Sequence, residues 1–294
     1  MSYDFTPPGP ALLPPERAAV FFDGIFSEPR ISHPEGVAIG PDGWVWCGNQ
    51  DGDILRIAPD ASTVERVATT GGFTLGLAFD GDRALFSCDL RHAAVFRLDL
   101  ASGELRRFTA PGIRIPNYPV VDAARGRLLV SDSHAFDTAG PGIWAYDLAT
   151  GAGSLWYDQP LVFANGLAMR PGDEAVYVCE TFAQRISRIP VRPDGSAGPA
   201  EPYSENLAGL PDGIAFDAAG ALVVGCYEPS RLLRISAGGG PAALLVEDVT
   251  AHTLAHPTNI AFDGPALYTA NLGRWHIARV TMDTGAPPLW KESL

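Results

Sequence analysis

The sequence predicts an all-β protein, a six-bladed β-propeller with four antiparallel strands in each blade. Three observations predict it. A short frame, in which a small or polar residue precedes an apolar strand, recurs six times along the 294 residues. Each copy is followed by turn residues and three further short apolar runs, and the chain is rich in turn formers, with 32 glycines and 26 prolines. Four strands repeated at a spacing of forty-odd residues are typical of propeller blades.

The recurring frame begins each unit and defines one key residue in it. The six copies cover residues 33–39, 74–79, 116–122, 164–169, 211–216 and 257–262. Their key residues are Glu35, Leu75, Asn117, Asn165, Asp212 and Thr258. Each copy supplies the first strand of a blade, because it is apolar, short and bounded by turn residues.

Three more strands follow in each unit. A turn such as 41–43 or 217–220 leads to the second strand, as expected for a tight hairpin. The second strands are predicted at 44–47, 84–87, 128–131, 175–178, 222–225 and 267–270. The third strands are predicted at 54–57, 95–98, 143–146, 186–189, 232–235 and 277–280, and the fourth at 64–67, 104–108, 154–157, 200–203 and 242–246.

The sixth unit lacks a fourth strand of its own. Residues 17–22 precede Glu35 much as the other fourth strands precede the next key residue. We therefore expect this N-terminal strand to complete the last blade and close the ring. Residues 1–16 hold five prolines and are predicted to be an irregular lead, and the whole of 1–294 is predicted to be one domain.

Composition limits the classes of partner. The chain has 21 basic and 34 acidic residues and a formal net charge of −13, which repels nucleic acid and anionic membranes. The N-terminus has neither a basic start nor a long apolar run, and no stretch reaches the ~20 apolar residues of a membrane helix. We expect a cytoplasmic protein, a monomer or weak homo-oligomer, that acts on a small molecule.

The four cysteines share one place in the repeat. Cys47, Cys88, Cys179 and Cys226 stand at the end of four second strands, where Ser131 and Ala270 stand in the other two. A position that accepts Cys, Ser and Ala needs a small residue. The cysteines are therefore predicted to be packing residues rather than disulfides or a thiolate metal site.

The key residues are predicted to meet at one end of the central channel, because the first strand of every blade lines it. Glu35, Asn117, Asn165 and Asp212 would bring two carboxylates and two carboxamides together. Two buried like charges are costly, and a divalent cation with oxygen ligands cancels that cost. Calcium is the first expectation, and zinc, magnesium, manganese or iron(II) also accept such ligands. The alternative is that these residues only cap turns before a glycine.

Residues after the second strands are predicted to line the rim of the same pocket, because that strand returns to the same face. They are Asn49, 89–92, 133–136, 180–182, Tyr227, Glu228 and Asn271. Of these, His134, Tyr227 and Asn271 are expected to orient a substrate. The alternative for His134 is a solvated loop histidine.

At these motifs the chain resembles the senescence marker protein, gluconolactonase and luciferin-regenerating enzyme family. The resemblance covers nearly the whole chain and is most specific at 33–36, 163–166, 210–213 and 255–259. It implies a divalent metal in the channel and hydrolysis of sugar lactones. It further implies that Glu35, Asn165 and Asp212 bind the metal, that Asn117 is a ligand or binds substrate, and that Asp212 is also the general base.

The third blade departs from that family. The family often has Asn-Asp-Gly there, with arginine two residues earlier, whereas this chain has Asn117-Tyr118-Pro119 and Ile115. Tyr118 and Ile115 predict a less polar pocket, so Tyr118 is a candidate substrate-binding residue. Residues 178–186 also look like strictosidine synthase-like proteins, and the paraoxonases share the Glu, Asn, Asn and Asp arrangement.

The sequence thus predicts a metal-dependent hydrolase that opens a small lactone, a sugar lactone or a related one, to its hydroxy acid. Two other functions are compatible with it. One is an esterase, paraoxonase-like or strictosidine synthase-like enzyme on the same scaffold. The other is a propeller that binds a metal or ligand without catalysis, since a fold alone does not determine function.

Overall fold

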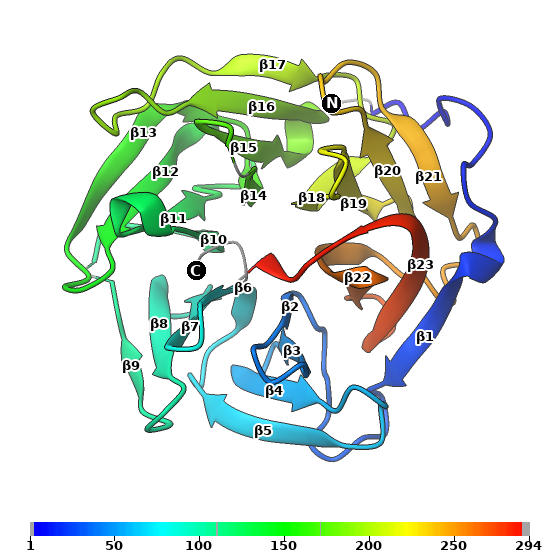
Figure 1. Cartoon of the computed structure of the whole chain (residues 1–294), viewed down its shortest axis with the longest axis horizontal. Helices are drawn as coiled ribbons and strands as arrows, with labels where there is room; N and C mark the ends of the chain where they lie inside the picture. The colour runs from blue at the N-terminus through cyan, green and yellow to red at the C-terminus, as the bar shows by residue number, and fades with distance from the viewer. Residues whose placement is uncertain (1–2, 110, 171, 290–294) are drawn as a thin grey trace.

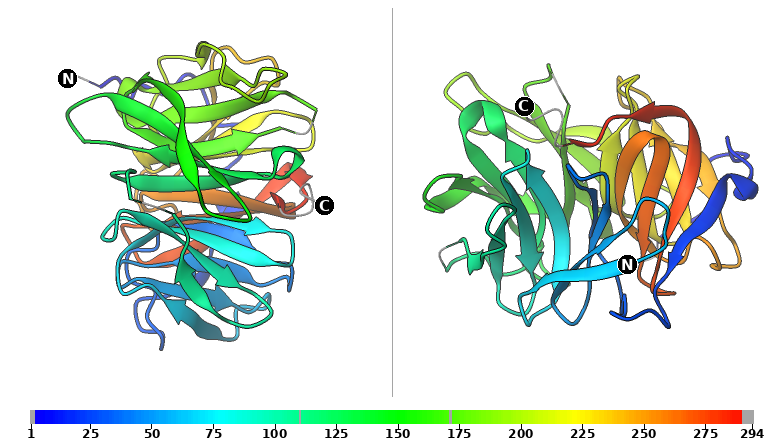
Figure 2. Two further views of the ribbon diagram at one scale, coloured as in Figure 1. Left: turned by 90° about the vertical axis from the view of Figure 1, so that its left-hand side faces the viewer. Right: turned by 60° about the horizontal axis from the view of Figure 1, so that its bottom comes forward.

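The computed structural model describes residues 3–109, 111–170 and 172–289 and forms a six-bladed β-propeller (Figure 1). Six antiparallel sheets stand around a central channel, and in five of them the strands follow one another outward in chain order. Two further views show the same blades from the side and tilted (Figure 2). The predicted fold class is confirmed.

The first three blades follow the predicted units closely. The first contains β2 (Val37–Ile39), β3 (Val45–Gly48), β4 (Asp53–Ile57) and β5 (Val64–Thr69). The second contains β6 (Thr74–Asp80), β7 (Ala84–Asp89), β8 (Ala94–Asp99) and β9 (Leu105–Arg107). The third contains β10 (Pro116–Asp122), β11 (Arg127–Asp132), β12 (Gly140–Asp147) and β13 (Gly153–Leu161).

The remaining blades include the closure of the ring. The fourth contains β14 (Ala164–Met169), β15 (Ala175–Glu180), β16 (Arg185–Pro190) and β17 (Glu201–Ser204), and the fifth contains β18 (Leu210–Phe216), β19 (Leu222–Glu228), β20 (Arg231–Ile235) and β21 (Ala243–Glu247). In the sixth, β22 (Pro257–Asn271) runs through Gly264 and supplies both inner strands, followed by β23 (His276–Ala286). The N-terminal β1 (Ala18–Asp23) pairs antiparallel with β23, which confirms the predicted closure.

Helix is scarce in the described part of the chain. It consists of three 3-10 turns, η1 (Pro15–Arg17), η2 (Ala123–Arg125) and η3 (Thr181–Ala183). None of these turns is long and apolar enough to cross a membrane. The lead before β1 is irregular, as predicted, but it is anchored, because Leu12 and Leu13 donate backbone hydrogen bonds to Leu244 and Leu245 of β21.

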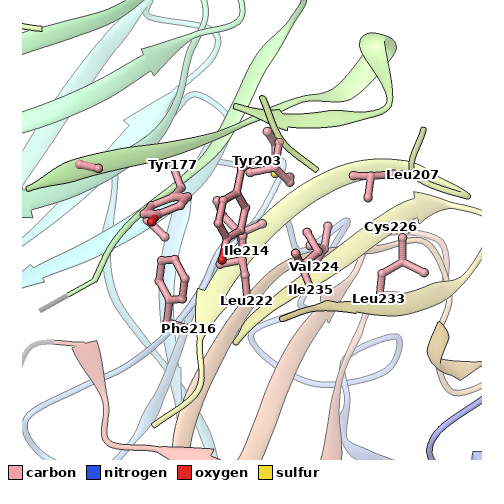
Figure 3. Packing of buried hydrophobic residues seen from close by; sticks show 14 of the residues in the cluster. Tyr177, Tyr203, Leu207, Ile214, Phe216, Leu222, Val224, Cys226, Leu233 and Ile235 are labelled. Atoms are coloured by element: carbon pink, nitrogen blue, oxygen red, sulfur yellow. The ribbon is translucent and has the colours of Figure 1, made fainter. Parts of the chain in front are cut away.

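Apolar side chains fill the spaces between neighbouring blades. One cluster lies between the fourth and fifth blades and includes Tyr177, Tyr203, Phe216 and Cys226 (Figure 3). All four cysteines are free and fully buried, and burial raises the thiol pKa of Cys47 and of Cys226 to about 12. Their predicted role as small packing residues is confirmed. The blades are thus joined by dry contacts, which makes the ring a rigid frame for the channel.

Candidate metal centre

The key residues lie in or directly before the innermost strands, at interruptions of the strand pairing. The register between first and second strand shifts between Pro116 and Pro119, and again between Ala164 and Leu167. The same shift occurs beside Leu75 and beside Asp212. A bulge of this kind takes residues out of the hydrogen-bond ladder and redirects their side chains. Leu75, Asn117, Asn165 and Asp212 therefore lie in bulged strands rather than in turns.

The glycines after the key residues serve close packing. None of Gly36, Gly166 and Gly213 has a left-handed φ, so none is required for a turn. A Cβ on Gly36 would instead overlap the backbone of Leu75, and one on Gly166 would overlap the backbone of Asp212. Each glycine thus lets its inner strand approach the key residue of the next blade. This packing brings successive key residues together around the axis.

Hydrogen bonds complete this ring between the last and the first blade. Thr258 Oγ1 donates to the carbonyl oxygen of Glu35 at 2.8 Å, and the Asn259 N–H donates to the same oxygen at 3.3 Å. The six key residues are all buried, with exposed fractions of 8% or less. The predicted convergence of the six inner strands at one end of the channel is therefore present.

Two hydroxyl groups fix the orientation of the asparagine side chains. Ser133 Oγ donates to the carbonyl oxygen of Ala164 at 2.8 Å, and Asn117 Nδ2 lies 3.1 Å from the same hydroxyl. Thr181 Oγ1 likewise donates to the carbonyl oxygen of Pro211 at 2.8 Å, with Asn165 Nδ2 at 3.2 Å.

A carbonyl oxygen can only accept a hydrogen bond, so each hydroxyl group must donate its single proton to the carbonyl oxygen that it contacts. The hydroxyl is then left as an acceptor, so the amide nitrogen of Asn117 or Asn165 must face it. The Oδ1 atoms of both asparagines therefore point away from the hydroxyls, and both are buried with no hydrogen-bond partner in the described chain. Buried acceptors are rarely left unpaired, so these two oxygens indicate a bound group.

The two carboxylates lie in the same buried space. Burial raises the pKa of Glu35 well above its ordinary value, and the charge of Asp212 raises it further. Burial also raises the pKa of Asp212, to about 7, although the amides of Asn165 and Asn259 partly counteract this. The two acids thus interact without a counter-charge from the protein: none of the ion pairs between described residues includes either of them.

This donor set fits a hard divalent cation. Two carboxylates supply the negative charge, and the Oδ1 atoms of Asn117 and Asn165 supply neutral oxygens. Within 3–109, 111–170 and 172–289 no cluster of three or more His, Cys, Asp or Glu side chains is present. A cation here would consequently depend on amide oxygens as much as on acids.

Asn259 is a residue of the site that the sequence analysis did not assign. Its Nδ2 donates to Asp212 Oδ1 at 3.2 Å, its N–H binds Glu35, and its Oδ1 is buried without a partner. It occupies the place that glycine holds after Glu35, Leu75, Asn165 and Asp212. The presence of asparagine where four other blades have glycine was the sequence signal that could have identified Asn259 as a site residue.

Tyr118 directly follows the key residue of the third blade, as Asn259 does in the sixth, but its side chain does not join the polar groups of the site. It is 3% exposed and packs between the third and fourth blades with residues such as Leu161 and Leu167. It also borders a cavity of about 220 Å³ at the opposite end of the channel. In that half β23 curves toward the axis (Figure 1), and Leu289 lines the cavity. The predicted contact of Tyr118 with substrate remains a prediction.

Two predicted rim residues, His134 and Tyr227, lie near the key residues at this end of the channel. His134 follows Ser133, with its Nε2 3.0 Å from an Arg114 nitrogen and its Nδ1 buried without a partner. Tyr227 is 37% exposed, and its ring centroid lies 4.9 Å from that of His256. Burial raises the pKa of Tyr227, and the nearby charges of Glu35 and Asp212 contribute to the rise.

Asn271, the third, is fully buried and engaged in local hydrogen bonds. Its Oδ1 accepts from the Ala255 N–H, and its Nδ2 donates to Thr269. Asp132 and Glu180 do the same in their blades: Asp132 accepts from the Ile115 N–H, and Glu180 from the Val162 N–H. These side chains hold the segments that lead into the key residues. The structure thus shows that Asn271, Asp132 and Glu180 position these segments. Contact of Asn271 with substrate stays a prediction.

Comparison with known proteins agrees with this architecture. The family described as "SMP-30/Gluconolactonase/LRE-like region" matches residues 91–272, and a strictosidine synthase-like N-terminal region matches residues 25–57. A 6-deoxy-6-sulfogluconolactonase from Pseudomonas putida is 30% identical over 112 residues, 37% of each chain. The Drosophila melanogaster adipocyte plasma membrane-associated protein Hemomucin is 24% identical over 67% of this chain and 39% of its own length. The matched part thus spans well under two thirds of either relative.

Solved structures share the fold. A gluconolactonase from Xanthomonas campestris superposes with a TM-score of 0.71 at 21% identity, over 90% of this chain and 89% of the other. A calcium-binding regucalcin from Agrobacterium tumefaciens gives a TM-score of 0.69 at 18% identity, over 87% and 93%. At such identities these similarities establish the propeller architecture and leave the chemistry to the residues of the channel.

Proposed function

The chain belongs to the SMP-30/gluconolactonase/LRE-like family, and on that premise we propose that it is a metal-dependent hydrolase that opens a lactone to its hydroxy acid. The observation that carries the proposal is the pair of unpaired amide oxygens on Asn117 and Asn165 beside two buried carboxylates. The gluconolactonases among its relatives and structural neighbours support the reaction class.

The residues that would hold the metal are Glu35, Asn165 and Asp212, with Asn117 as a further ligand or as a contact to substrate. The calcium-binding neighbour supports calcium as the ion. A bound divalent cation would supply Lewis acidity, which polarises an ester carbonyl and stabilises negative charge on its oxygen.

Asp212 has the properties of the proton-transferring group. Its Oδ1 is held by Asn259 Nδ2, and without a bound cation its pKa is about 7. The Asp212 carboxylate would accept a proton from an attacking water and return it to the ring oxygen of the lactone as that bond breaks. The proton is thus passed from water to the leaving hydroxyl, and Asp212 is regenerated.

Activity with and without metal tests the proposal. The purified protein is stripped with a chelator, reloaded with single divalent cations, and assayed for acid release from aliphatic, aryl and sugar lactones. We expect turnover of at least one class that is lost on stripping and restored by one cation. Absence of metal-dependent turnover on every substrate would refute the lactonase proposal.

A second candidate is the hydrolysis of aryl esters by the same residues. It is favoured by three phenylalanine rings on the segments that orient the asparagines, two of them 4.8 Å apart between centroids. The same assay with phenyl acetate distinguishes the two. Tight metal binding without hydrolysis of any lactone or ester would instead indicate a binding protein.

A further inference from the structure

Three phenylalanine rings form an aromatic ledge between the third and fourth blades. The ring centroids of Phe136 and Phe163 are 5.0 Å apart, those of Phe163 and Phe182 are 4.8 Å apart, and those of Phe136 and Phe182 are 6.5 Å apart. Such separations are typical of interacting aromatic pairs. The three rings come from three different segments, and Phe136 presents an exposed ring that packs on the buried ring of Phe163.

The ledge is built on the segments that orient the asparagines. Phe136 lies three residues after Ser133, whose hydroxyl holds Asn117. Phe182 directly follows Thr181, whose hydroxyl holds Asn165. Phe163 lies two residues before Asn165, and its carbonyl oxygen accepts a hydrogen bond from the Thr181 N–H at 3.3 Å. The ledge therefore shares its segments with the residues that orient both asparagines.

Folding alone does not account for the ledge. Phe136 is 70% exposed, so its ring gains little from burial in the folded chain. Phe163 has a φ of +57°, and His33 and His256, which also stand two residues before a key residue, share this left-handed conformation, so it belongs to the repeated frame. Exposed aromatic surface such as the ring of Phe136 is a feature that accompanies ligand sites.

We propose that the aromatic ledge binds a flat apolar substituent of the substrate, so that the preferred lactones carry an aromatic group beside the scissile carbonyl rather than the hydroxyl groups of a sugar. This inference rests on the proposed hydrolase function. Phenylalanine rings offer no hydrogen bonds, so sugar hydroxyls pressed against them would lose water without compensation. An aromatic substituent loses nothing there and stacks on the exposed face of Phe136.

The test compares two lactones that share a ring and differ only in the apolar group, γ-phenyl-γ-butyrolactone and γ-butyrolactone. For the metal-loaded wild type we expect kcat/KM to favour the phenyl compound by about tenfold, a ratio typical of one apolar group in a matching pocket. Phe136→Ala should abolish most of this ratio, and Phe136→Leu should keep part of it. Leu155→Ala, which truncates an exposed apolar residue of the outer strand β13, is the matched control and should keep the full ratio.

Equilibrium binding of 3-phenylcyclopentanone and cyclopentanone, which cannot be hydrolysed, separates the ledge from the reaction. Tighter binding of the phenyl ketone that Phe136→Ala removes would support the ledge even if neither lactone is hydrolysed, in which case only the proposed function fails. If both lactones are hydrolysed with a ratio near one, and Phe136→Ala changes neither the ratio nor ketone binding, the ledge proposal is overturned while the hydrolase stands. Absence of both hydrolysis and preferential ketone binding would also overturn it.

Discussion

The propeller buries two kinds of carboxylate, and the fifth blade contains one of each. Asp212 lies near the start of β18 and Asp217 directly follows its end, and both are buried. Asp217 lies 2.9 Å from Arg234 and accepts the N–H groups of Ala219 and Ala221. Asp212 has no cationic partner among the described residues, and its charge raises the pKa of the neighbouring carboxyl of Glu35.

The difference separates structural from functional acids. The channel-facing acids meet a second carboxylate, whereas other buried acids, such as Asp122 and Glu180, face the arginines Arg127 and Arg185. Removing one partner of a buried ion pair leaves the other without compensation and destabilises the native state. An unpaired buried acid destabilises the native state until a cation arrives. We therefore expect substitutions at Asp212 and Asp217 to have opposite consequences.

The largest expected effect is on catalysis. Asp212→Asn removes the proton acceptor while keeping the shape of the side chain, so kcat/KM on any lactone that the wild type hydrolyses should fall at least ~100-fold. Circular dichroism should show an unchanged fold. Asp217→Asn is the control in the same blade and should retain wild-type kcat/KM. Rates near wild type for Asp212→Asn would show that another group transfers the proton.

The second effect is on stability, where the substitution at Asp217 and not the one at Asp212 should be harmful. Asp217→Ala removes the partner of Arg234 and two hydrogen bonds to backbone N–H groups. Its free energy of unfolding should fall by about 3 kcal/mol, as expected for breaking a buried pair. Asp212→Asn should equal or exceed the wild type when both are measured in chelator, because it removes one of two like charges. Urea unfolding of the three proteins measures this, and a marked loss of stability in Asp212→Asn would contradict the comparison.

The frame of the repeats explains what the sequence could predict. The position of a residue in a repeated unit fixes its strand and its end of the channel, so Glu35, Asn165 and Asp212 could be placed together before any coordinates. The same register placed Cys47 and Cys226 among the packing residues. Register also placed Asn271 at the rim, but it did not predict that the Asn271 side chain binds the backbone of Ala255. Which way a side chain at a strand end turns depends on backbone groups in a neighbouring segment, which the repeat does not specify.

The aromatic ledge could not be predicted from the sequence for a similar reason. Phe136, Phe163 and Phe182 lie at three unrelated places in their units, and their contact depends on loop conformations, including the left-handed φ of Phe163. The hydroxyls of Ser133 and Thr181 were closer to being found. Both stand 16 residues after an asparagine key residue. A shared hydroxyl at a fixed offset from a shared amide was a readable signal for the orientation of that amide.

The smallest expected effect is the pH dependence of stability in the metal-free protein. Burial raises the pKa of Glu35 well above its ordinary value, with the charge of Asp212 adding to the rise, and burial raises the pKa of Asp212 to about 7. Between the ordinary carboxyl range and about pH 7, the native state therefore binds more protons than the unfolded chain, which is already ionised. Stability must fall as pH rises through this window.

Thermal unfolding in chelator from pH 4.5 to 7.5 measures this slope, and ~100 Kd of the activating cation should offset it at the upper end, since a ligand bound only to the native state adds about 2.7 kcal/mol. Asp212→Asn should flatten the slope, because it leaves a single carboxylate at the centre. Asp217→Asn should keep the wild-type slope, because Asp217 is not part of the central pair. A metal-free wild type that gains stability between these pH values would mean that paired acids elsewhere dominate, and the division between the two kinds of buried carboxylate would then not govern this protein.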